Sequence, residues 1–184
     1  MKFVQPIRDM EKVAEIMEFL LEQSDRNHML FLTGIYTGLR ISDILSLKSK
    51  DVQGKYIDIK EKKTRKSKII PIIPEYRREI KKYIADKDDD EYLFKSRKGL
   101  NKPIHRGMAY KILRSAAYVC GLENIGTHTL RKTFGYHMYS STKDVAMLQN
   151  IFNHSTPEHT LRYIGITQDS IEKAMMKLSY KKNR

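Results

Sequence analysis

The chain has 184 residues, and its 35 lysines and arginines outnumber its 22 acidic residues, which gives a formal net charge of +13 at pH 7. With 40% hydrophobic residues, this composition excludes a disordered chain and favours one folded domain. The longest stretches without a charged residue, 27–39 and 145–157, are too short to cross a bilayer. The single cysteine, Cys120, has no partner within the chain, so we expect a protein of the reducing cytoplasm that does not bind membranes.

The large positive charge indicates a polyanionic partner. Lysines and arginines that displace condensed counterions from a phosphate backbone gain free energy from the release of those ions. Nucleic acid is therefore the first candidate, and the alternative on composition alone is a ribosome-associated or merely basic protein.

The first half of the chain predicts three helices followed by a β-hairpin. Asp9 can cap a helix whose apolar residues recur at three- and four-residue steps. Gly38 stands where a helix would end, so we expect a break in the chain just before Arg40. The expected helices cover 10–21, 29–36 and 41–47, and the expected strands cover 56–59 and 69–73. The two strands would pair as a hairpin with a long basic turn.

The second half of the chain is predicted to be almost entirely helical. The expected helices cover 74–84, 105–120, 128–140, 143–152, 157–163 and 168–178, with a third strand at 92–94. We expect Gly165 to turn the chain and Thr167 to cap the last helix. The predicted fold class is therefore α+β, mostly helical, with a small antiparallel β-sheet.

Two arginines stand in settings that suit the binding of an anion. Arg40 directly follows the glycine-marked break, and Asp43 lies one helical turn further on, where it can orient the guanidinium. An ordinary surface salt bridge is the alternative for this pair. His128 and Arg131 have the i,i+3 spacing that places an imidazole and a guanidinium on one helix face, so both can address the same substrate group.

A second histidine and a tyrosine follow in the C-terminal part of the chain. His154 and Tyr163 are nine residues apart, which would put them on opposite faces of one continuous helix. Thr156 and Pro157 remove this objection, because a threonine can cap a new helix and a proline can begin it. The chain is therefore expected to turn between the two side chains.

The ordered set of these residues resembles the catalytic domain of the tyrosine recombinase (phage integrase) family, and the resemblance covers almost the whole chain. Segment 37–43, TGLRISD, is similar to the family's first arginine box. Segment 127–134, THTLRKTF, is similar to its second arginine box. Segment 153–155, NHS, is similar to its Gly-His-Ser box with asparagine in place of glycine, and Tyr163 falls where the family has its nucleophile.

The resemblance implies a chemical role for each of these side chains. Arg40 and Arg131 would clamp a DNA phosphodiester and stabilise the charge on its nonbridging oxygens. Tyr163 would attack the phosphorus and form a covalent 3′-phosphotyrosyl intermediate. His128 would accept the proton of the tyrosine, and His154 would donate a hydrogen bond to the phosphate. This chemistry needs no metal and no cofactor.

The resemblance also implies a catalytic lysine on the β-hairpin. The hairpin offers five lysines, and spacing alone does not choose among them: Lys60, Lys62, Lys63, Lys66 and Lys68. Similarity to the family selects Lys63, just before Thr64, as the acid that protonates the leaving 5′ oxygen, with Lys66 as second choice. Four further basic side chains are expected to contact DNA phosphates: Arg65, Lys66, Lys68 and Lys132.

The function implied by the resemblance is a site-specific DNA recombinase or integrase that cleaves and rejoins double-stranded DNA. It would act as a dimer or tetramer on DNA, with accessory DNA-bending proteins, and would be a nucleoid-associated protein of bacterial or phage origin. One alternative is a type IB topoisomerase, which shares the tyrosine chemistry. The other is a non-cleaving DNA-binding regulator descended from a recombinase. Tyr180, in the tail, is the rival nucleophile.

The C-terminal segment is predicted to serve assembly. It carries an apolar stripe at positions i, i+3, i+4 and i+7, formed by Ile171, Ala174, Met175 and Leu178. The stripe either packs on its own domain or docks on a neighbouring protomer, as the resemblance implies. We therefore expect a catalytic domain over residues 1–166 and, over 167–184, a C-terminal helix and basic tail that docks on that neighbour.

Overall fold

The computed structural model describes residues 4–177, except for the side chain of Ala174. The stripe residue Leu178 and the rival tyrosine Tyr180 therefore lie outside the described residues. The chain divides into two compact units, and the division falls between Phe134 and Gly135. The part up to Phe134 is named unit 1, and the part from Gly135 onward is named unit 2.

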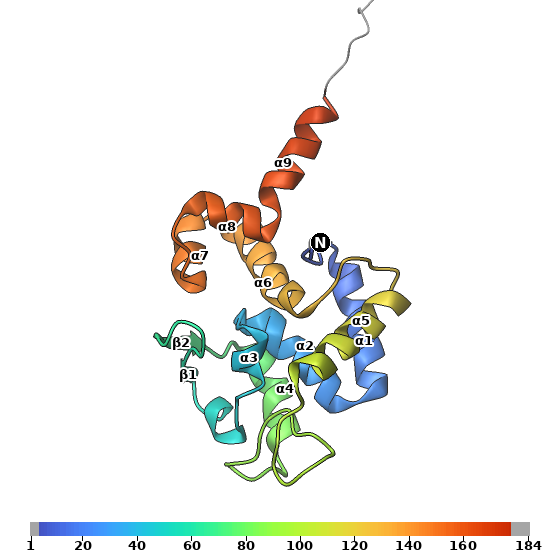
Figure 1. Ribbon diagram of the computed structural model, residues 1–184, viewed down its shortest axis with the longest axis vertical. Helices are drawn as coiled ribbons and strands as arrows, with labels where there is room; N and C mark the ends of the chain where they lie inside the picture. Colours follow the sequence, from blue (N-terminus) through green and yellow to red (C-terminus); the bar gives the residue numbers. More distant parts are fainter. Residues whose placement is uncertain (1–3, 178–184) are drawn as a thin grey trace, which may run out of the picture. The chain divides into compact units, whose positions relative to one another are not determined.

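Unit 1 contains the β-hairpin and the helices around it (Figure 1). Its elements are α1 (Met10–Gln23), α2 (Asp25–Thr37), α3 (Ile41–Ile44), the 3₁₀ turn η1 (Ser49–Val52), β1 (Tyr56–Lys60), β2 (Ser67–Pro71), α4 (Pro74–Ile84), α5 (Arg106–Val119) and the first half of α6 (Thr127–Thr142). Helices dominate the chain, and the described residues form one small antiparallel sheet. The predicted fold class is confirmed.

The first helix begins and packs as its sequence predicts. The side chain of Asp9 accepts a hydrogen bond from the backbone N–H of Glu11 at 2.8 Å, which satisfies one of the free donors at the start of α1. The stripe of Val13, Ile16 and Leu20 is buried in one of the two apolar clusters of unit 1. Burial of each such side chain contributes about 1.5–3 kcal/mol, so this stripe holds α1 on the rest of the unit.

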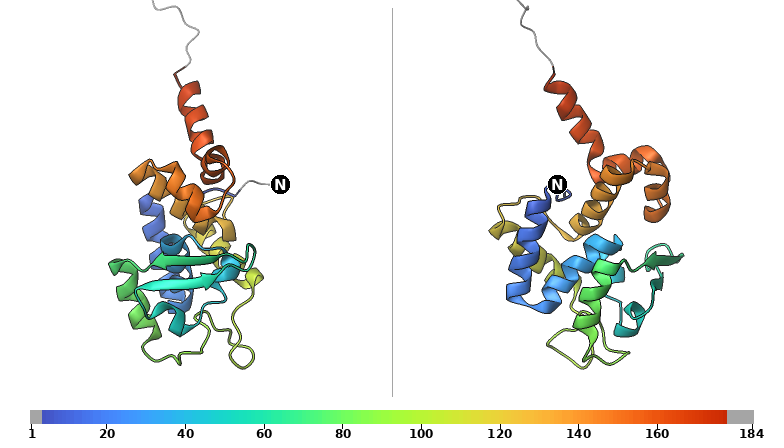
Figure 2. Two further views of the ribbon diagram at one scale, coloured as in Figure 1. Left: turned by 90° about the vertical axis from the view of Figure 1, so that its left-hand side faces the viewer. Right: turned by 180° about the vertical axis from the view of Figure 1, so that it is seen from behind.

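The two strands form the predicted hairpin (Figure 2). Their antiparallel register runs from Tyr56 opposite Pro71 to Lys60 opposite Ser67. Ile57 and Ile70 are paired across the strands and are buried in the second apolar cluster. Because successive side chains on a strand alternate between faces, this register fixes which residues of the hairpin face the core.

The prediction of a third strand at 92–94 is wrong. Tyr92 makes an isolated bridge with Lys48, and the N–H of Leu93 donates to the carbonyl oxygen of Leu47 at 2.8 Å, but no ladder follows. Leu93 and Phe94 are fully buried in the core. The apolar run therefore reflects burial of a loop rather than strand pairing, which a short run of residues does not distinguish.

Two glycines bring α2 into direct contact with the first half of α6. A side chain at Gly34 would collide with Leu130, and a side chain at Gly38 would collide with Phe134. Gly38 also ends α2 in the left-handed conformation, with φ +61°, as the sequence predicts. These glycines place the turn before Arg40 against the helix that carries Arg131.

Unit 2 consists of the second half of α6, α7 (Val145–Phe152), α8 (Pro157–Ile164) and α9 (Ile166–Met175). Asn153, with φ +54°, ends α7 in the left-handed conformation. The side chain of Thr156 accepts a hydrogen bond from the N–H of His159 at 3.1 Å, and Pro157 begins α8. The predicted turn between His154 and the helix of Tyr163 is thereby confirmed.

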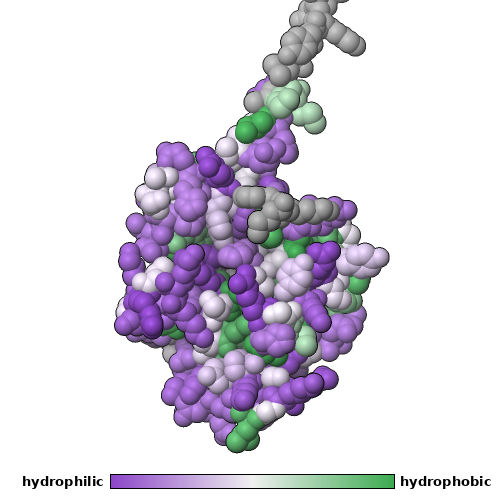
Figure 3. Space-filling view, viewed as in Figure 1, coloured by the Kyte–Doolittle hydropathy of each residue, from purple (hydrophilic) through white to green (hydrophobic). Residues whose placement is uncertain are grey.

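The last helix differs from its prediction at the start. Gly165 ends α8 with φ +88°, as expected, but α9 already begins at Ile166. Thr167 therefore lies inside the helix, and the prediction that it caps α9 is wrong. Ile171 and Met175 are 48% and 63% exposed, and hydrophobic surface is visible toward the end of α9 in Figure 3.

Candidate active site

Arg131 is buried beside the turn from which Arg40 emerges. The side chain is on α6, is only 2% exposed, and donates from Nη1 to the carbonyl oxygen of Gly38 at 2.6 Å. Gly38 is two residues before Arg40, which occupies the N-cap position of α3. This hydrogen bond ties the second arginine to the backbone that presents the first.

Arg40 is paired with a carboxylate that the sequence did not single out. Its Nη1 forms an ion pair with Oε2 of Glu61 at 2.7 Å, and the Arg40 side chain is 17% exposed. Asp43, the predicted partner, is buried and instead accepts the backbone N–H of Lys62 on Oδ1 at 3.0 Å. Asp43 therefore anchors the tip of the hairpin, while Glu61 orients Arg40.

Glu61 is a residue of the candidate site that the sequence analysis does not identify. It is the one acidic residue in the segment 60–68, KEKKTRKSK, which is otherwise basic or hydroxylic. One acidic residue among so many cations indicates an ion pair. That its partner is Arg40 depends on the tertiary structure, so the sequence does not reveal it. Burial would raise the pKa of Glu61, yet the hydrogen bond from Thr64 and the charges of Arg40 and Lys68 outweigh burial and lower it.

His128 lies in the first turn of α6, near the two arginines. The residue is exposed at the surface, but neighbouring atoms desolvate the ring, and this desolvation, followed by the positive charges of Arg106 and Arg131, lowers its pKa. A lowered pKa keeps the imidazole neutral near pH 7, and a neutral imidazole can accept a proton. The electrostatic setting therefore suits the role of proton acceptor that the resemblance implies.

The hairpin lysines differ sharply in exposure. Lys63, Arg65 and Lys66 are exposed at the tip, whereas the Lys68 side chain is only 15% exposed. Burial and the repulsion of Arg131 lower the pKa of Lys68 to about 8, although Glu61 opposes this effect. Lys68 thus lies with Arg40, Glu61 and Arg131 rather than at the exposed tip. These four residues are named the arginine cluster.

Lys132, a predicted phosphate contact, is in the interior of unit 1. It is 5% exposed, and burial followed by the charge of Arg8 lowers its pKa to about 8. This burial argues against a direct contact between Lys132 and a DNA phosphate.

His154 and Tyr163 lie next to each other in unit 2. Their ring centroids are 5.0 Å apart in an edge-to-face arrangement, and Phe152 packs edge-on against Tyr163 at 5.6 Å. Nδ1 of His154 is 3.1 Å from the hydroxyl oxygen of Thr160, a hydrogen bond that fixes the orientation of the imidazole. The turn at 153–157 therefore brings together the two side chains that a straight helix would separate.

The predicted site residues are thus distributed over both units. Unit 1 carries the arginine cluster, His128 and the hairpin lysines, and unit 2 carries the histidine–tyrosine pair. Within unit 1, contacts bring together Arg40, Glu61, Lys68 and Arg131.

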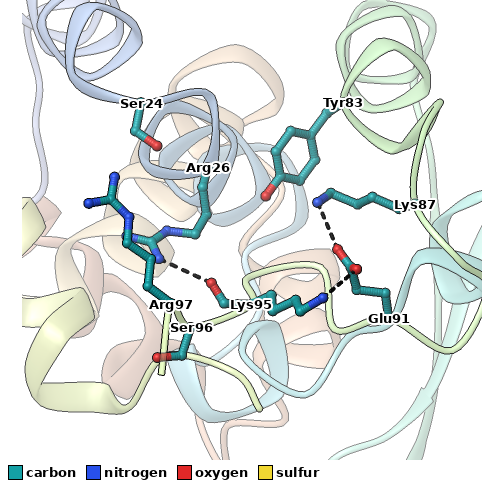
Figure 4. Close-up of a pocket in the computed structure, with 8 residues that line it drawn as sticks. All are labelled: Ser24, Arg26, Tyr83, Lys87, Glu91, Lys95, Ser96 and Arg97. Atoms are coloured by element: carbon teal, nitrogen blue, oxygen red, sulfur yellow. Dashed lines mark hydrogen bonds and ion pairs between the residues drawn. The ribbon is translucent and has the colours of Figure 1, made fainter. Parts of the chain in front are cut away.

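A separate pocket of about 310 Å³ in unit 1 contains none of the predicted catalytic residues (Figure 4). Its lining is Ser24, Arg26, Tyr83, Lys87, Glu91, Lys95, Ser96 and Arg97. Glu91 pairs with Lys87 at 3.0 Å and Lys95 at 2.8 Å, and Arg26 donates to the carbonyl oxygen of Lys95 at 3.1 Å. Most of its charges therefore hold the local loops together.

Among residues 4–177, no three histidine, cysteine or acidic side chains gather in a way that could hold a metal ion. Over the same residues, no helix is both long and apolar enough to cross a membrane.

Comparisons with known sequences identify similar proteins. The sequence profile of the phage integrase family matches residues 8–169. The probable integrase/recombinase YoeC of Bacillus subtilis is 53% identical over 175 residues, which are 95% of this chain and 96% of that protein. The tyrosine recombinase XerA of Pyrococcus furiosus is 26% identical over 94% of this chain, but over only 62% of its own length. The chain thus spans about three fifths of this longer relative.

Comparisons with solved structures show the same fold. The crystal structure of XerA recombinase superposes with a TM-score of 0.74 at 20% identity, covering 96% of this chain and 67% of that one. The catalytic domain of bacteriophage HP1 integrase gives 0.62 at 20% identity, with 95% of each chain covered. A lambda integrase dimer bound to a core site gives 0.66 at 15% identity, covering 89% and 60%.

Proposed function

Because the chain belongs to the phage integrase family, we propose that it is a site-specific recombinase that cleaves and rejoins double-stranded DNA through a tyrosine. The observation that carries the proposal is the hydrogen bond from Arg131 to Gly38, which holds one guanidinium beside the turn that presents Arg40. Two guanidiniums fixed in this way suit the two nonbridging oxygens of a phosphodiester.

The arginines stabilise the transition state. Attack on phosphorus concentrates negative charge on the nonbridging oxygens, and donors already in place need no reorganisation as that charge develops. A guanidinium presents paired N–H donors in one plane, and these match the oxygens of a phosphate. We therefore assign both arginines to the stabilisation of the phosphate charge. In this proposal, no metal ion or cofactor takes part in that stabilisation.

Tyr163 is the nucleophile in this proposal. Its oxygen forms a bond to phosphorus as the bond between phosphorus and the 5′ oxygen breaks, which leaves a 3′-phosphotyrosyl link. The phenolic proton passes to the neutral imidazole of His128, and Lys63 gives a proton to the leaving 5′ oxygen. His154 donates to the phosphate. Attack by a 5′ hydroxyl of a partner strand reverses these steps and rejoins the DNA.

The assignment of partners rests on the similar structures and on charge. The lambda integrase structure named above is a dimer bound to a core site, another lambda integrase structure is bound to DNA, and this chain has a net charge of +13. We propose that the chain binds double-stranded DNA as a dimer or tetramer, with accessory DNA-bending proteins. The exposed Arg65 and Lys66 would contact phosphates, and the protein would act on the nucleoid of a bacterial cytoplasm.

The domain assignment follows from α9. Residues 1–166 would form the catalytic domain, and 167–184 would form a helix and basic tail that docks on a neighbouring protomer. The exposed apolar side chains of Ile171 and Met175 support this proposal, because burial on a neighbour removes them from water.

The experiment is a search for a covalent adduct. Nicked duplexes tiled across the DNA that flanks the gene would trap a cleaving enzyme, because the short fragment beyond the nick diffuses away and prevents rejoining. We expect an adduct that resists denaturation, its loss in Tyr163→Phe, and unchanged DNA binding by that variant. Tyr118→Phe is the matched control, since Tyr118 is 84% exposed on α5. DNA binding without an adduct on any duplex would instead favour the non-cleaving regulator.

A further inference from the structure

Glu61 places a negative charge inside the arginine cluster of unit 1. The Glu61 side chain is 3% exposed, and its Oε2 accepts a hydrogen bond from the hydroxyl of Thr64 at 2.7 Å. A buried carboxylate loses much of its hydration, so it remains ionised only where cations and donors compensate. Arg40 supplies that compensation at 2.7 Å.

The two oxygens of Glu61 face two different cations. Oε2 is paired with Arg40, and Oε1 lies 3.7 Å from Nζ of Lys68. Arg40 precedes α3 and Lys68 belongs to β2, so the carboxylate joins two separate segments of the fold. The backbone of Glu61 is itself held, because its N–H donates to Lys66 O and its carbonyl accepts from Arg65 N, both at 2.9 Å.

The pKa of Lys68 depends on the charge of Glu61. Burial and the nearby Arg131 and Arg40 disfavour the charged ammonium, whereas Glu61 favours it. The balance brings the pKa of Lys68 to about 8. Glu61 therefore keeps Lys68 charged near neutral pH, next to the two arginines assigned to the phosphate.

We propose that Glu61 is a positioning residue, which holds Arg40 and Lys68 so that both donate to the scissile phosphate. Lys68 is then a third cation at the phosphate, in addition to the exposed lysine assigned to the leaving group. The inference rests on the proposed function, because that function places a phosphate beside Arg40. The opposing view is that Glu61 merely occupies the phosphate position and must be displaced by DNA.

The first test compares Glu61→Gln with Glu91→Gln. Glu91 is a matched control because it also bridges two cations, and the substitution removes the same charge. Single-turnover cleavage at saturating DNA should slow by roughly 10- to 100-fold in Glu61→Gln, with little change in DNA affinity, because the donors lose their alignment. Glu91→Gln should cleave like the parent chain. Cleavage by Glu61→Gln at the parent rate or faster would overturn the proposal and support the opposing view.

A second test uses Lys68→Arg, which keeps the charge at every accessible pH. The second-order rate constant for cleavage, measured at subsaturating DNA, reports the protonation of the free protein. Lys68 loses its charge as pH rises through about 8, so the ratio of the Lys68→Arg rate to the parent rate should increase above that pH. A ratio that stays constant with pH would remove Lys68 from the phosphate site.

A third measurement needs no cleavage. It therefore separates the proposal about Glu61 from the proposed recombinase function. The lysine side-chain carbons of the DNA-free protein can be followed by NMR as a function of pH, with Lys68 assigned from the Lys68→Arg spectrum. We expect Glu61→Gln to lower the pKa of Lys68, because it removes the charge that favours the ammonium. An unchanged pKa would overturn the coupling between Glu61 and Lys68. Failure of the parent chain to form any adduct would instead count against the proposed function.

Discussion

Unit 1 and unit 2 hold their proposed catalytic side chains by different means. In unit 1, Arg131 is buried and bonded to a backbone carbonyl, and Arg40 is paired with a buried carboxylate. In unit 2, His154 and Tyr163 are half-buried, their rings pack edge-to-face, and His154 shares a hydrogen bond with the hydroxyl of Thr160. The proposed phosphate-binding arginines are therefore held by buried contacts of unit 1, whereas the proposed nucleophile lies at a half-buried position beside an imidazole.

Because of this difference, substitutions in the two units should affect different steps. Donors fixed by close packing stabilise a transition state because they do not reorganise. The proposed nucleophile, Tyr163, is on α8, which is followed directly by α9 with its exposed apolar side chains. We expect substitutions in unit 1 to act on the chemical step, and changes in α9 to act on assembly.

The largest expected effect concerns Lys63. This lysine is exposed at the hairpin tip, unlike the buried arginine of unit 1. Lys63→Ala should slow cleavage by roughly 10³-fold when the leaving group is a 5′ oxygen, because general acid catalysis is lost. A 5′ sulfur leaves without a proton, so the same variant should cleave that substrate almost normally. Lys66→Ala, the second choice on the same tip, is put through the same comparison, and any loss it causes should be the same on both substrates, as expected for a phosphate contact. Equal losses on both substrates would show that Lys63 is not the acid.

The next effect concerns the arginines themselves. Arg40→Lys and Arg131→Lys should each slow cleavage by roughly 10²-fold, because an ammonium keeps the charge but loses the paired hydrogen bonds of a guanidinium. Arg114→Lys, on the exposed side of α5, should have no effect on rapid-quench cleavage rates. A normal rate in either of the first two variants would make that arginine structural.

Disrupting the contact between α2 and α6 should have a smaller effect. This effect is measured as a change in the free energy of unfolding. Gly38→Ala combines an unfavourable positive φ with a collision against Phe134, and should lower the free energy of unfolding by about 2–4 kcal/mol. Gly121→Ala also has a positive φ, but it meets no atom within 4 Å, and should cost only about 1 kcal/mol. Urea unfolding of both variants gives the difference. Equal losses would mean that Phe134 adapts and that this contact does not fix the Arg40 turn.

The smallest effect on the chemical step is expected from α9. Truncation after Ile166 should leave the protein folded and change the cleavage rate only severalfold, but it should abolish higher-order complexes on paired sites in native gels. Met175→Glu should act in the same direction, because it puts a charge on the exposed apolar face. Leu100→Glu is the control, since Leu100 is 95% exposed outside unit 2. Complexes that survive truncation would contradict docking on a neighbour.

The sequence predicts those parts of the fold that are determined locally. The cap of α1, the left-handed end of α2 and the start of α8 depend on Asp9, Gly38 and Pro157, whose preferences act over one turn of chain. The false third strand shows the limit of this reasoning. Burial of Leu93 and Phe94 produces the apolar run of a strand, and only the tertiary structure shows that no partner strand is there.

The same limit applies to the candidate site. The arginines, histidines and tyrosine can be found from the sequence because they lie in ordered motifs of recognisable spacing. The pairing of Arg40 with Glu61 and the burial of Lys68 and Lys132 could not be found, because they depend on how the hairpin and α6 pack. Among five hairpin lysines, side-chain exposure separates Lys68 from the tip, and spacing does not.

The proposed function requires that Tyr163 forms the covalent bond to DNA. The most direct measurement is tandem mass spectrometry of the peptide that stays attached to a trapped, nuclease-trimmed DNA fragment. We expect a phosphonucleotide on Tyr163, within the α8 peptide that follows Thr156. A modification on Tyr180, or on any serine or threonine, would show that Tyr163 is not the nucleophile.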